Sequence, residues 1–124
     1  EGSAMHNARI LIIDDEESIR NILTEYLERL GFQILTAADG LEGLDCIKQE
    51  NYDLIIIDIR LPYVSGIGLI KVARDINPKV PIISITGFGK YSESTAKEEA
   101  TIVLSKPFQL EQLSQTITQL LATP

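Results

Sequence analysis

The chain has 124 residues, enough for one domain with a proper core, and 44% of them are hydrophobic, as is ordinary for a globular protein. It carries 11 basic and 18 acidic residues, and the net charge of −7 argues against direct binding of nucleic acid or of an anionic membrane by bulk charge. The apolar runs are too short to cross a bilayer, no secretory signal is visible, and Cys46 alone cannot form an internal disulfide, so we expect a cytoplasmic location.

Apolar strand-like segments alternate with amphipathic helix-like segments along the whole chain. Gly31 and the pair Asn77-Pro78 supply helix stops, and Asp39 with Glu42 supplies a capping box that starts a helix. In chain order the predicted elements are strand 9–13, helix 19–30, strand 32–37, helix 39–47, strand 54–58, helix 69–76, strand 80–86, a weakly helical polar segment 92–99, strand 102–104 and helix 110–121. This alternation predicts βαβ units with right-handed crossovers, and therefore a single doubly wound, five-stranded parallel sheet with helices on both faces.

The domain organisation is simple. Residues 1–4 precede Met5 and are typical of a short remnant of cloning, so we take the domain as residues 5–124. No linker, internal repeat or low-complexity tract divides this stretch. We therefore expect one folding unit.

Asp58 is the most informative residue, because it closes the apolar run Leu54 to Ile57. A run of that composition is typical of a strand buried on both faces, and carboxylates are rarely buried unless they are paired or bind a metal. Ligands of open α/β sheets bind at the carboxyl ends of the strands. Asp58 is therefore a candidate reactive or ligating carboxylate.

Polar residues also follow the other predicted strands. Asp14 and Asp15 end the first strand, Thr86 ends the fourth, and Lys106 follows the fifth. If the first strand lies beside the third, with the fourth and fifth beyond it, these side chains converge with Asp58 at one edge of the sheet.

Three carboxylates in one small site repel one another unless a cation is present. Mg²⁺ suits such a site, since it binds one or two carboxylates and accepts phosphate oxygens. Lys106 adds a compact positive charge, and Thr86 adds a hydroxyl that can donate to a phosphoryl oxygen. Together these groups favour phosphoryl transfer to an aspartate, in which positioning and charge neutralisation do most of the catalytic work.

Five short motifs occur in register along residues 8–122. They are Ile12 to Glu16, Ile56 to Pro62, Ser65-Gly66, Ile85 to Gly87, and Lys106 to Phe108. With these motifs the chain resembles the receiver domain, or phosphoacceptor domain, of two-component response regulators. The resemblance implies a flavodoxin-like fold with strand order 2-1-3-4-5 and a role in phosphorelay signal transduction. It further implies that a sensor histidine kinase or a phosphotransfer protein donates the phosphoryl group to Asp58.

The resemblance also implies roles for the other site residues. Asp15 and Asp58 would ligate Mg²⁺ directly, Asp14 would act mainly through water, and the backbone carbonyl of Arg60 would be a further ligand. Thr86 would turn inward to contact the phosphoryl group.

Lys106 would pair with the phosphoryl group, and its peptide bond to Pro107 is expected to be cis. The partner of the switched surface would be a downstream effector domain or protein, and a weak homodimer is left open.

Alternatives remain at this stage. A degenerate receiver would act as a constitutive interaction module. An aspartyl-phosphate hydrolase of the haloacid dehalogenase kind needs a second Asp as acid and base, but Arg60 occupies that position, so we expect a switch and not an enzyme. A flavodoxin-like cofactor binder would need a phosphate-binding loop where Asp14 and Asp15 stand.

Two positions depart from the family pattern. Val103 replaces the usual Tyr or Phe of the fifth strand, and a stiff β-branched side chain cannot report phosphorylation by rotating a ring. The segment between Thr86 and Lys106 is also short, and residues 92–99 lack a clear apolar stripe. We therefore expect a fourth helix that is short, shifted or mobile, and signalling that depends more on backbone shifts there.

Overall fold

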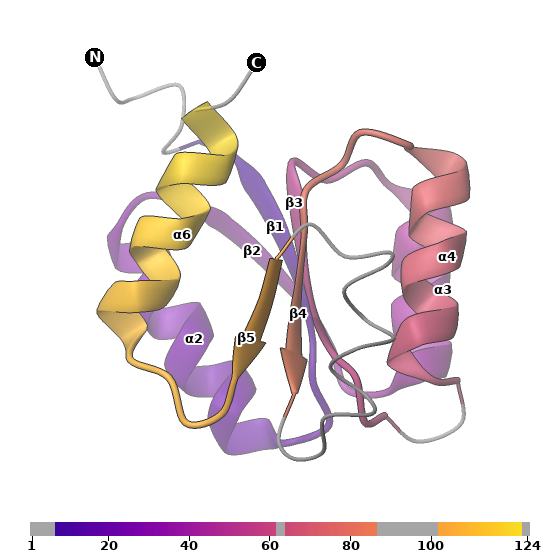
Figure 1. The fold of residues 1–124 in the computed structure, drawn as a ribbon, viewed down its shortest axis with the longest axis horizontal. Helices are drawn as coiled ribbons and strands as arrows, with labels where there is room; N and C mark the ends of the chain where they lie inside the picture. The colour runs from indigo at the N-terminus through magenta and orange to yellow at the C-terminus, as the bar shows by residue number, and fades with distance from the viewer. Residues whose placement is uncertain (1–6, 62–63, 87–101, 123–124) are drawn as a thin grey trace.

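A computed structural model describes residues 7–61, 64–86 and 102–122 as one parallel sheet between two pairs of helices (Figure 1). The strands are β1 (Arg9–Ile13), β2 (Gln33–Ala37), β3 (Leu54–Asp58), β4 (Ile82–Thr86) and β5 (Ile102–Ser105). The helices of the described residues are α2 (Glu17–Arg29), α3 (Gly40–Gln49), α4 (Gly66–Ile76) and α6 (Leu110–Ala122). The strand order β2-β1-β3-β4-β5 confirms the predicted fold class.

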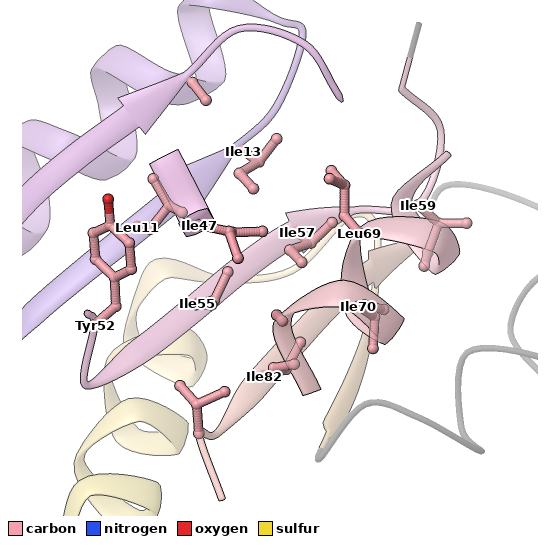
Figure 2. Packing of buried hydrophobic residues seen from close by; sticks show 13 residues of the cluster. Leu11, Ile13, Ile47, Tyr52, Ile55, Ile57, Ile59, Leu69, Ile70 and Ile82 are labelled. Carbon is pink, nitrogen blue, oxygen red and sulfur yellow. The ribbon is translucent and has the colours of Figure 1, made fainter. Parts of the chain in front are cut away.

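The sheet is buried on both faces, which explains why its central strands are continuously apolar. Side chains of a strand alternate between the two faces, so Leu11 and Ile13 of β1 pack toward α3 and α4 whereas Ile10 and Ile12 pack toward α2 and α6. Figure 2 shows the first of these layers, where Leu11 and Ile13 lie over β3 near Ile47 of α3. These four β1 side chains are fully buried, and this holds the carboxyl end of the strand in a fixed place.

Local signals set the helix ends as predicted. Asp39 caps α3 as predicted, since its carboxylate accepts a hydrogen bond from the backbone N–H of Glu42 at 2.8 Å. The return bond of the predicted capping box is shifted by one residue, because the Glu42 carboxylate accepts from the backbone N–H of Ala38 at 2.6 Å and not from that of Asp39. Gly31 follows α2 with a φ of 100°, a left-handed conformation that favours glycine. None of the described helices has the length and hydropathy needed to span a bilayer.

The largest difference between a predicted and an observed strand boundary lies at the start of β4, while β2 begins and β5 ends one residue later than predicted. Residues 80–86 read as a strand, but β4 begins only at Ile82. The backbone N–H of Val80 bonds to the carbonyl of Asn77 at 3.2 Å, in a turn that leaves α4, and Pro81 has no N–H to offer a neighbouring strand. Val80 nevertheless stays in the core, which is why its apolar side chain read as part of the strand.

The predicted segment 92–99 and the leader 1–4 lie outside the described residues, so the expected short fourth helix stays a prediction. Val103 lies in β5, half-buried, and packs against the cluster that includes α3 and α4.

Helix α4 begins directly beneath the carboxyl end of β3. Ser65 caps it by accepting a hydrogen bond from the backbone N–H of Gly68 at 3.1 Å, and the backbone N–H of Gly66 bonds to the carbonyl of Ile59 at 3.2 Å. A Cβ atom at Gly66 would lie 2.4 Å from the carbonyl oxygen of Asp58 and 2.7 Å from the Cα of Ile59. The close approach of the helix to the strand therefore requires glycine at this position.

We predict that Gly66→Ala lowers the free energy of unfolding by about 1–3 kcal/mol, because the backbone it meets has to move. Gly68→Ala is the matched control in the same helical turn. Its Cβ would be 3.3 Å from the Ser65 hydroxyl oxygen, and alanine favours the helix, so we expect a change within about 1 kcal/mol of zero. Urea unfolding followed by circular dichroism measures both, and equal stabilities of the two variants would contradict the prediction.

Candidate functional site

The parallel pairing of β1 with β3 brings two carboxylates together. Ile13 lies opposite Ile57 in the register, so the next residues, Asp14 and Asp58, leave the sheet side by side. Asp14 is 1% exposed and Asp58 is 4% exposed, whereas Asp15 is exposed to solvent. One carboxylate oxygen from each of the three residues lies within 4.8 Å of the others, so the predicted cluster is confirmed as a geometry.

The two buried carboxylates are oriented by backbone N–H groups. Asp14 accepts a hydrogen bond through Oδ1 from the N–H of Glu16 at 2.9 Å, and Asp58 accepts one through Oδ1 from the N–H of Arg60 at 2.9 Å. In both cases the donor is two residues further along the chain, the pattern of an Asx turn. The other oxygen, Oδ2, is thereby left for the shared space between the two residues.

Helix α2 fixes the backbone of the same site. The guanidinium of Arg20 donates to the carbonyl oxygen of Asp14 at 2.7 Å, and the N–H of Asp14 donates to the carbonyl of Ala37 at 3.2 Å. Asp14 is thus held by α2 on one side and by β2 on the other. No pattern in the sequence indicates this role of Arg20.

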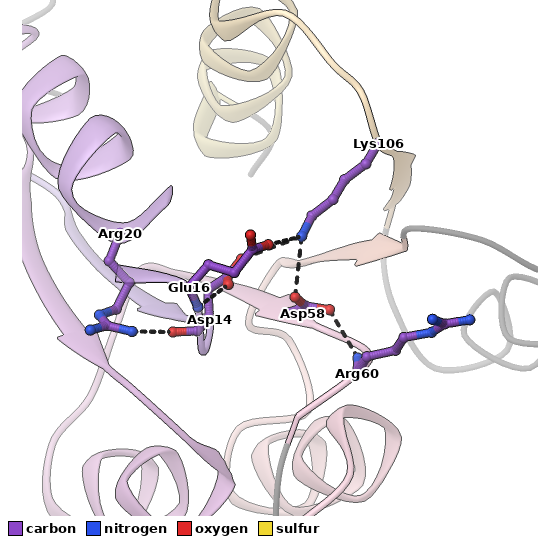
Figure 3. A network of polar contacts seen from close by, with 6 residues as sticks. All are labelled: Asp14, Glu16, Arg20, Asp58, Arg60 and Lys106. Atoms are coloured by element: carbon purple, nitrogen blue, oxygen red, sulfur yellow. Dashed lines mark hydrogen bonds and ion pairs between the residues drawn. The ribbon is translucent and has the colours of Figure 1, made fainter. Parts of the chain in front are cut away.

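Lys106 reaches the cluster from the segment after β5 (Figure 3). Its ammonium nitrogen lies 3.3 Å from Oδ2 of Asp58, 3.1 Å from Oε1 of Glu16 and 3.9 Å from Oδ2 of Asp14. Burial lowers the pKa of Lys106, but the hydrogen bonds from its ammonium to Glu16 and Asp58 and the negative charges of Asp58 and Asp14 outweigh burial and raise it. The peptide bond from Lys106 to Pro107 is cis, as expected.

The charges around Asp14 do not balance without a cation. Burial, together with the nearby charges of Asp58 and Glu16, raises the pKa of Asp14 from 3.8 to about 6, although the N–H of Glu16 and the charge of Lys106 act in the opposite direction. Oδ2 of Asp14 is buried and has no hydrogen-bond partner among the described residues. An orphaned carboxylate oxygen facing two further carboxylates fits a hard cation such as Mg²⁺, with Asp14, Asp15 and Asp58 as the residues that would hold it.

The remaining predicted site residues lie at the same edge. Thr86 ends β4 and pairs in register with Ser105, which directly precedes Lys106. Arg60 follows Asp58 by two residues, and its side chain extends away from the Asp58 carboxylate (Figure 3). The roles predicted for the Thr86 hydroxyl and for the Arg60 carbonyl stay predictions.

Glu16 is a contact that the sequence reasoning missed. Its carboxylate approaches Lys106 as closely as that of Asp58 does. The available signal was the third acid of the run Asp14, Asp15 and Glu16, which read only as part of a motif.

Comparison with known proteins decides the family. Residues 10–118 match the family model for the response regulator receiver domain. The chain belongs to the response regulator receiver domain family. It is a receiver domain of two-component systems and works in phosphorelay signal transduction. Receiver domains generally bind Mg²⁺ in an acidic pocket and pair with histidine kinases and effector domains, and this receiver has an acidic cluster of Asp14, Asp15 and Asp58.

Relatives and solved structures agree with this assignment. The receiver is 31% identical to sporulation initiation phosphotransferase F of Bacillus subtilis over 115 residues, which cover 91% of this chain and 93% of the relative. It superimposes on a CheY-like receiver domain protein from Methanospirillum hungatei with a TM-score of 0.89 and 30% identity, over 93% of this chain and 94% of that one. Response regulator TrrA from Thermotoga maritima, solved in complex with Mg²⁺-BeF, gives a TM-score of 0.83 and 34% identity, over 91% of this chain and 98% of that one.

Other relatives of the receiver are longer. The chain spans about half the length of several curated relatives named as transcriptional regulators, among them PhoP of Bacillus subtilis, which is 34% identical over 117 residues. In that case the match covers 93% of this chain and 49% of the relative.

We predict that Asp14→Asn raises the free energy of unfolding of the metal-free receiver at pH 7.5 by about 1–2 kcal/mol, since Asn keeps the acceptor for the Glu16 N–H and removes a buried charge. The pKa of Asp14 is higher in the folded state than its ordinary value, so the folded state binds more protons and loses stability as the pH rises from about 4 to about 6. Below pH 4 the advantage of Asn should therefore vanish.

Urea unfolding in the presence of a chelator, at pH 7.5 and at pH 3.5, measures this effect. Asp15→Asn is the matched control, because Asp15 is exposed and its charge is solvated, and we expect it to change stability little. A gain for Asp14→Asn that persists unchanged at pH 3.5 would argue against an unfavourable buried charge.

Proposed function

We propose that Asp58 is the phosphoacceptor of this receiver, and that Mg²⁺-dependent transfer to it from a phosphohistidine switches a surface recognised by a downstream partner. One observation carries the assignment. Oδ1 of Asp58 is tied to the backbone of Arg60, while Oδ2 faces both Lys106 and the unpartnered Oδ2 of Asp14. This oxygen, which is not tied to the backbone, therefore lies where a nucleophile needs a neighbouring cation to accept a phosphoryl group.

In the transfer step, Oδ2 of Asp58 forms a bond to phosphorus as the P–N bond of the phosphohistidine breaks, and the leaving imidazole takes a proton. Bound Mg²⁺, held by Asp14, Asp15 and Asp58 with the Arg60 carbonyl, would neutralise charge on the phosphoryl oxygens.

Two further groups of the chain act on the product. The Lys106 ammonium lies close enough to Asp58 to form an ion pair with the phosphoryl group after transfer. Thr86 at the end of β4 would supply a hydroxyl donor to the same group. Preorganised charge of this kind lowers the barrier without any proton transfer by the protein.

We propose that the receiver is a switch and not a turnover enzyme. Efficient hydrolysis of the aspartyl phosphate would need a positioned acid and base next to it. Arg60 stands at the position where a haloacid dehalogenase-type hydrolase has its second Asp, and its side chain points away from Asp58 (Figure 3). A degenerate receiver is the remaining alternative, and the phosphorylation experiment below separates the two.

An apolar groove beside the site supports a protein as the phosphodonor. It has a volume of about 510 Å³ and shares Glu16 and Lys106 with the site. Its apolar walls come from α2, from the segment between β5 and α6, and from the first residue of α6: Ile19, Ile22, Leu23, Pro107, Phe108 and Leu110. Ile22 is 49% exposed, so this wall of the groove presents apolar surface to solvent. We propose that a helix of the sensor kinase or phosphotransfer protein occupies this groove and presents its phosphohistidine to Asp58.

The recipient of the signal is proposed from the longer relatives. Relatives twice as long are named as transcriptional regulators, so an effector domain or a separate effector protein is the proposed recipient of the signal, and a cytoplasmic location suits such a partner. Val103 cannot report the phosphorylation state of Asp58 by ring rotation, so we propose that a backbone shift carries the signal to the surface. A weak homodimer of the receiver is a further proposed state.

We predict that the receiver gains the mass of one phosphoryl group when it is incubated with Mg²⁺ and acetyl phosphate, and that Asp58→Asn gains none. Removal of Mg²⁺ with a chelator should reduce the wild-type gain to the background level, since the carboxylates then repel the anionic donor. Intact-mass spectrometry measures the product. No gain in the wild type would favour the degenerate receiver.

We predict that Ile22→Ala slows phosphotransfer from a protein donor about tenfold, in the range of a truncated apolar contact at an interface, and leaves phosphorylation by acetyl phosphate unchanged. The protein donor is the one that phosphorylates the wild type fastest in a panel of purified sensor kinases and phosphotransfer proteins. Leu41→Ala is the matched control, because Leu41 is equally exposed, at 53%, but belongs to α3 and lies outside the groove. Equal slowing by both variants would count against docking in the groove.

A further inference from the structure

Glu16 lines the groove but has no part in the transfer step proposed above, yet it makes the shortest ion pair of Lys106 among the described residues. Its Oε1 lies 3.1 Å from the ammonium nitrogen, against 3.3 Å for Oδ2 of Asp58 (Figure 3). Its backbone N–H is fixed on Asp14, so the Cα of Glu16 is held next to the site while its side chain, 56% exposed, reaches over it. The Lys106 ammonium is therefore shared between a buried acceptor and an exposed one.

A purely structural role explains this contact poorly. Glu16 is the N-cap residue of α2, but its side chain makes no capping hydrogen bond there. Glu17 already supplies an acidic side chain to the first turn of the helix. The Glu16 carboxylate instead forms an ion pair with Lys106.

We propose that Glu16 is a positioning residue that holds the Lys106 ammonium beside Asp58 in the resting state and thereby limits the rate at which Asp58 is phosphorylated. This inference rests on the roles proposed above for Asp58 and Lys106.

The distribution of charge supports this positioning of Lys106 by Glu16. The carboxylates that fit a cation are those of Asp14, Asp15 and Asp58, and Glu16 is not part of that cluster. When a cation satisfies the other three, Glu16 is the carboxylate left to attract Lys106. An incoming phosphoryl group must then draw the ammonium away from it.

The ion pair between Glu16 and Lys106 is weak enough to break. The Glu16 side chain is more than half exposed, and ion pairs in contact with water contribute little because solvent screens them. Lys106 can therefore pass from Glu16 to a phosphoryl oxygen within the reach of its own flexible side chain. The expected effect of Glu16 on the rate is accordingly a few-fold and not orders of magnitude.

The test is a double-mutant cycle on the rate of phosphorylation by acetyl phosphate in the presence of Mg²⁺. In this reaction an oxygen of Asp58 bonds to phosphorus as the P–O bond breaks and acetate leaves. We expect Glu16→Gln to raise the rate roughly two- to five-fold, the range of one exposed ion pair. In a Lys106→Met background the same substitution should bring no gain, because there is no ammonium to release.

Glu17→Gln is the matched control, since it removes the same charge one residue further along and makes no ion pair with Lys106 in the described structure. It should leave the rate unchanged. A gain from Glu16→Gln that persists in the Lys106→Met background would assign the effect to direct repulsion of the donor and overturn the inference. A rate that is unchanged or lower in Glu16→Gln would overturn it as well. A wild type that takes up no phosphoryl group would instead overturn the proposed function on which the inference rests.

Discussion

Two carboxylates placed side by side at the end of a buried sheet are the constraint on which the rest of the site depends. The register of β1 with β3 fixes this placement. Asp14 directly follows the last residue of β1, Asp58 is the last residue of β3, and the paired strand positions before them are fully buried. Burial, with the nearby charge of Asp58 as a smaller cause, raises the pKa of Asp14 to about 6, and one of its oxygens has no hydrogen-bond partner in the described structure. The site therefore has an excess of negative charge that further positive charge would stabilise.

The protein supplies only part of that charge. Lys106 is the one cation within 4.0 Å of the Asp58 carboxylate among the described side chains, and it is shared with Glu16 and, more distantly, with Asp14. A single ammonium facing several carboxylates can move between them at little energetic cost. The same shortage of positive charge that fits the site for a cation underlies the proposed transfer of Lys106 from Glu16 to a phosphoryl group.

Much of this could be predicted from the sequence, for identifiable physical reasons. Asp58 stood out because an apolar strand led directly into it, and strands of this composition are buried on both faces. The convergence of Asp14, Asp58 and Lys106 follows from a general property of parallel sheets, whose carboxyl ends meet at one edge. The start of β4 was predicted two residues early, because Val80 is apolar and buried although its backbone forms a turn.

Contacts that depend on side-chain reach could not be predicted in this way. The bond from Arg20 to the Asp14 carbonyl and the pairing of Glu16 with Lys106 join residues whose separation in space depends on how α2 leaves the sheet. Nothing in a periodicity or a short motif encodes that angle.

The close approach of Gly66 to β3 has a mechanical consequence. Because no room exists between the Asp58 carbonyl and the first residue of α4, the backbone of Asp58 and the helix are in rigid contact. Ser65 and Gly68 tie that first turn together, so the helix cannot absorb a displacement by fraying at its end. A shift of the Asp58 main chain would therefore be transmitted along α4 toward Ile76 as the motion of a stiff rod, on the side of the sheet opposite to the groove beside Lys106.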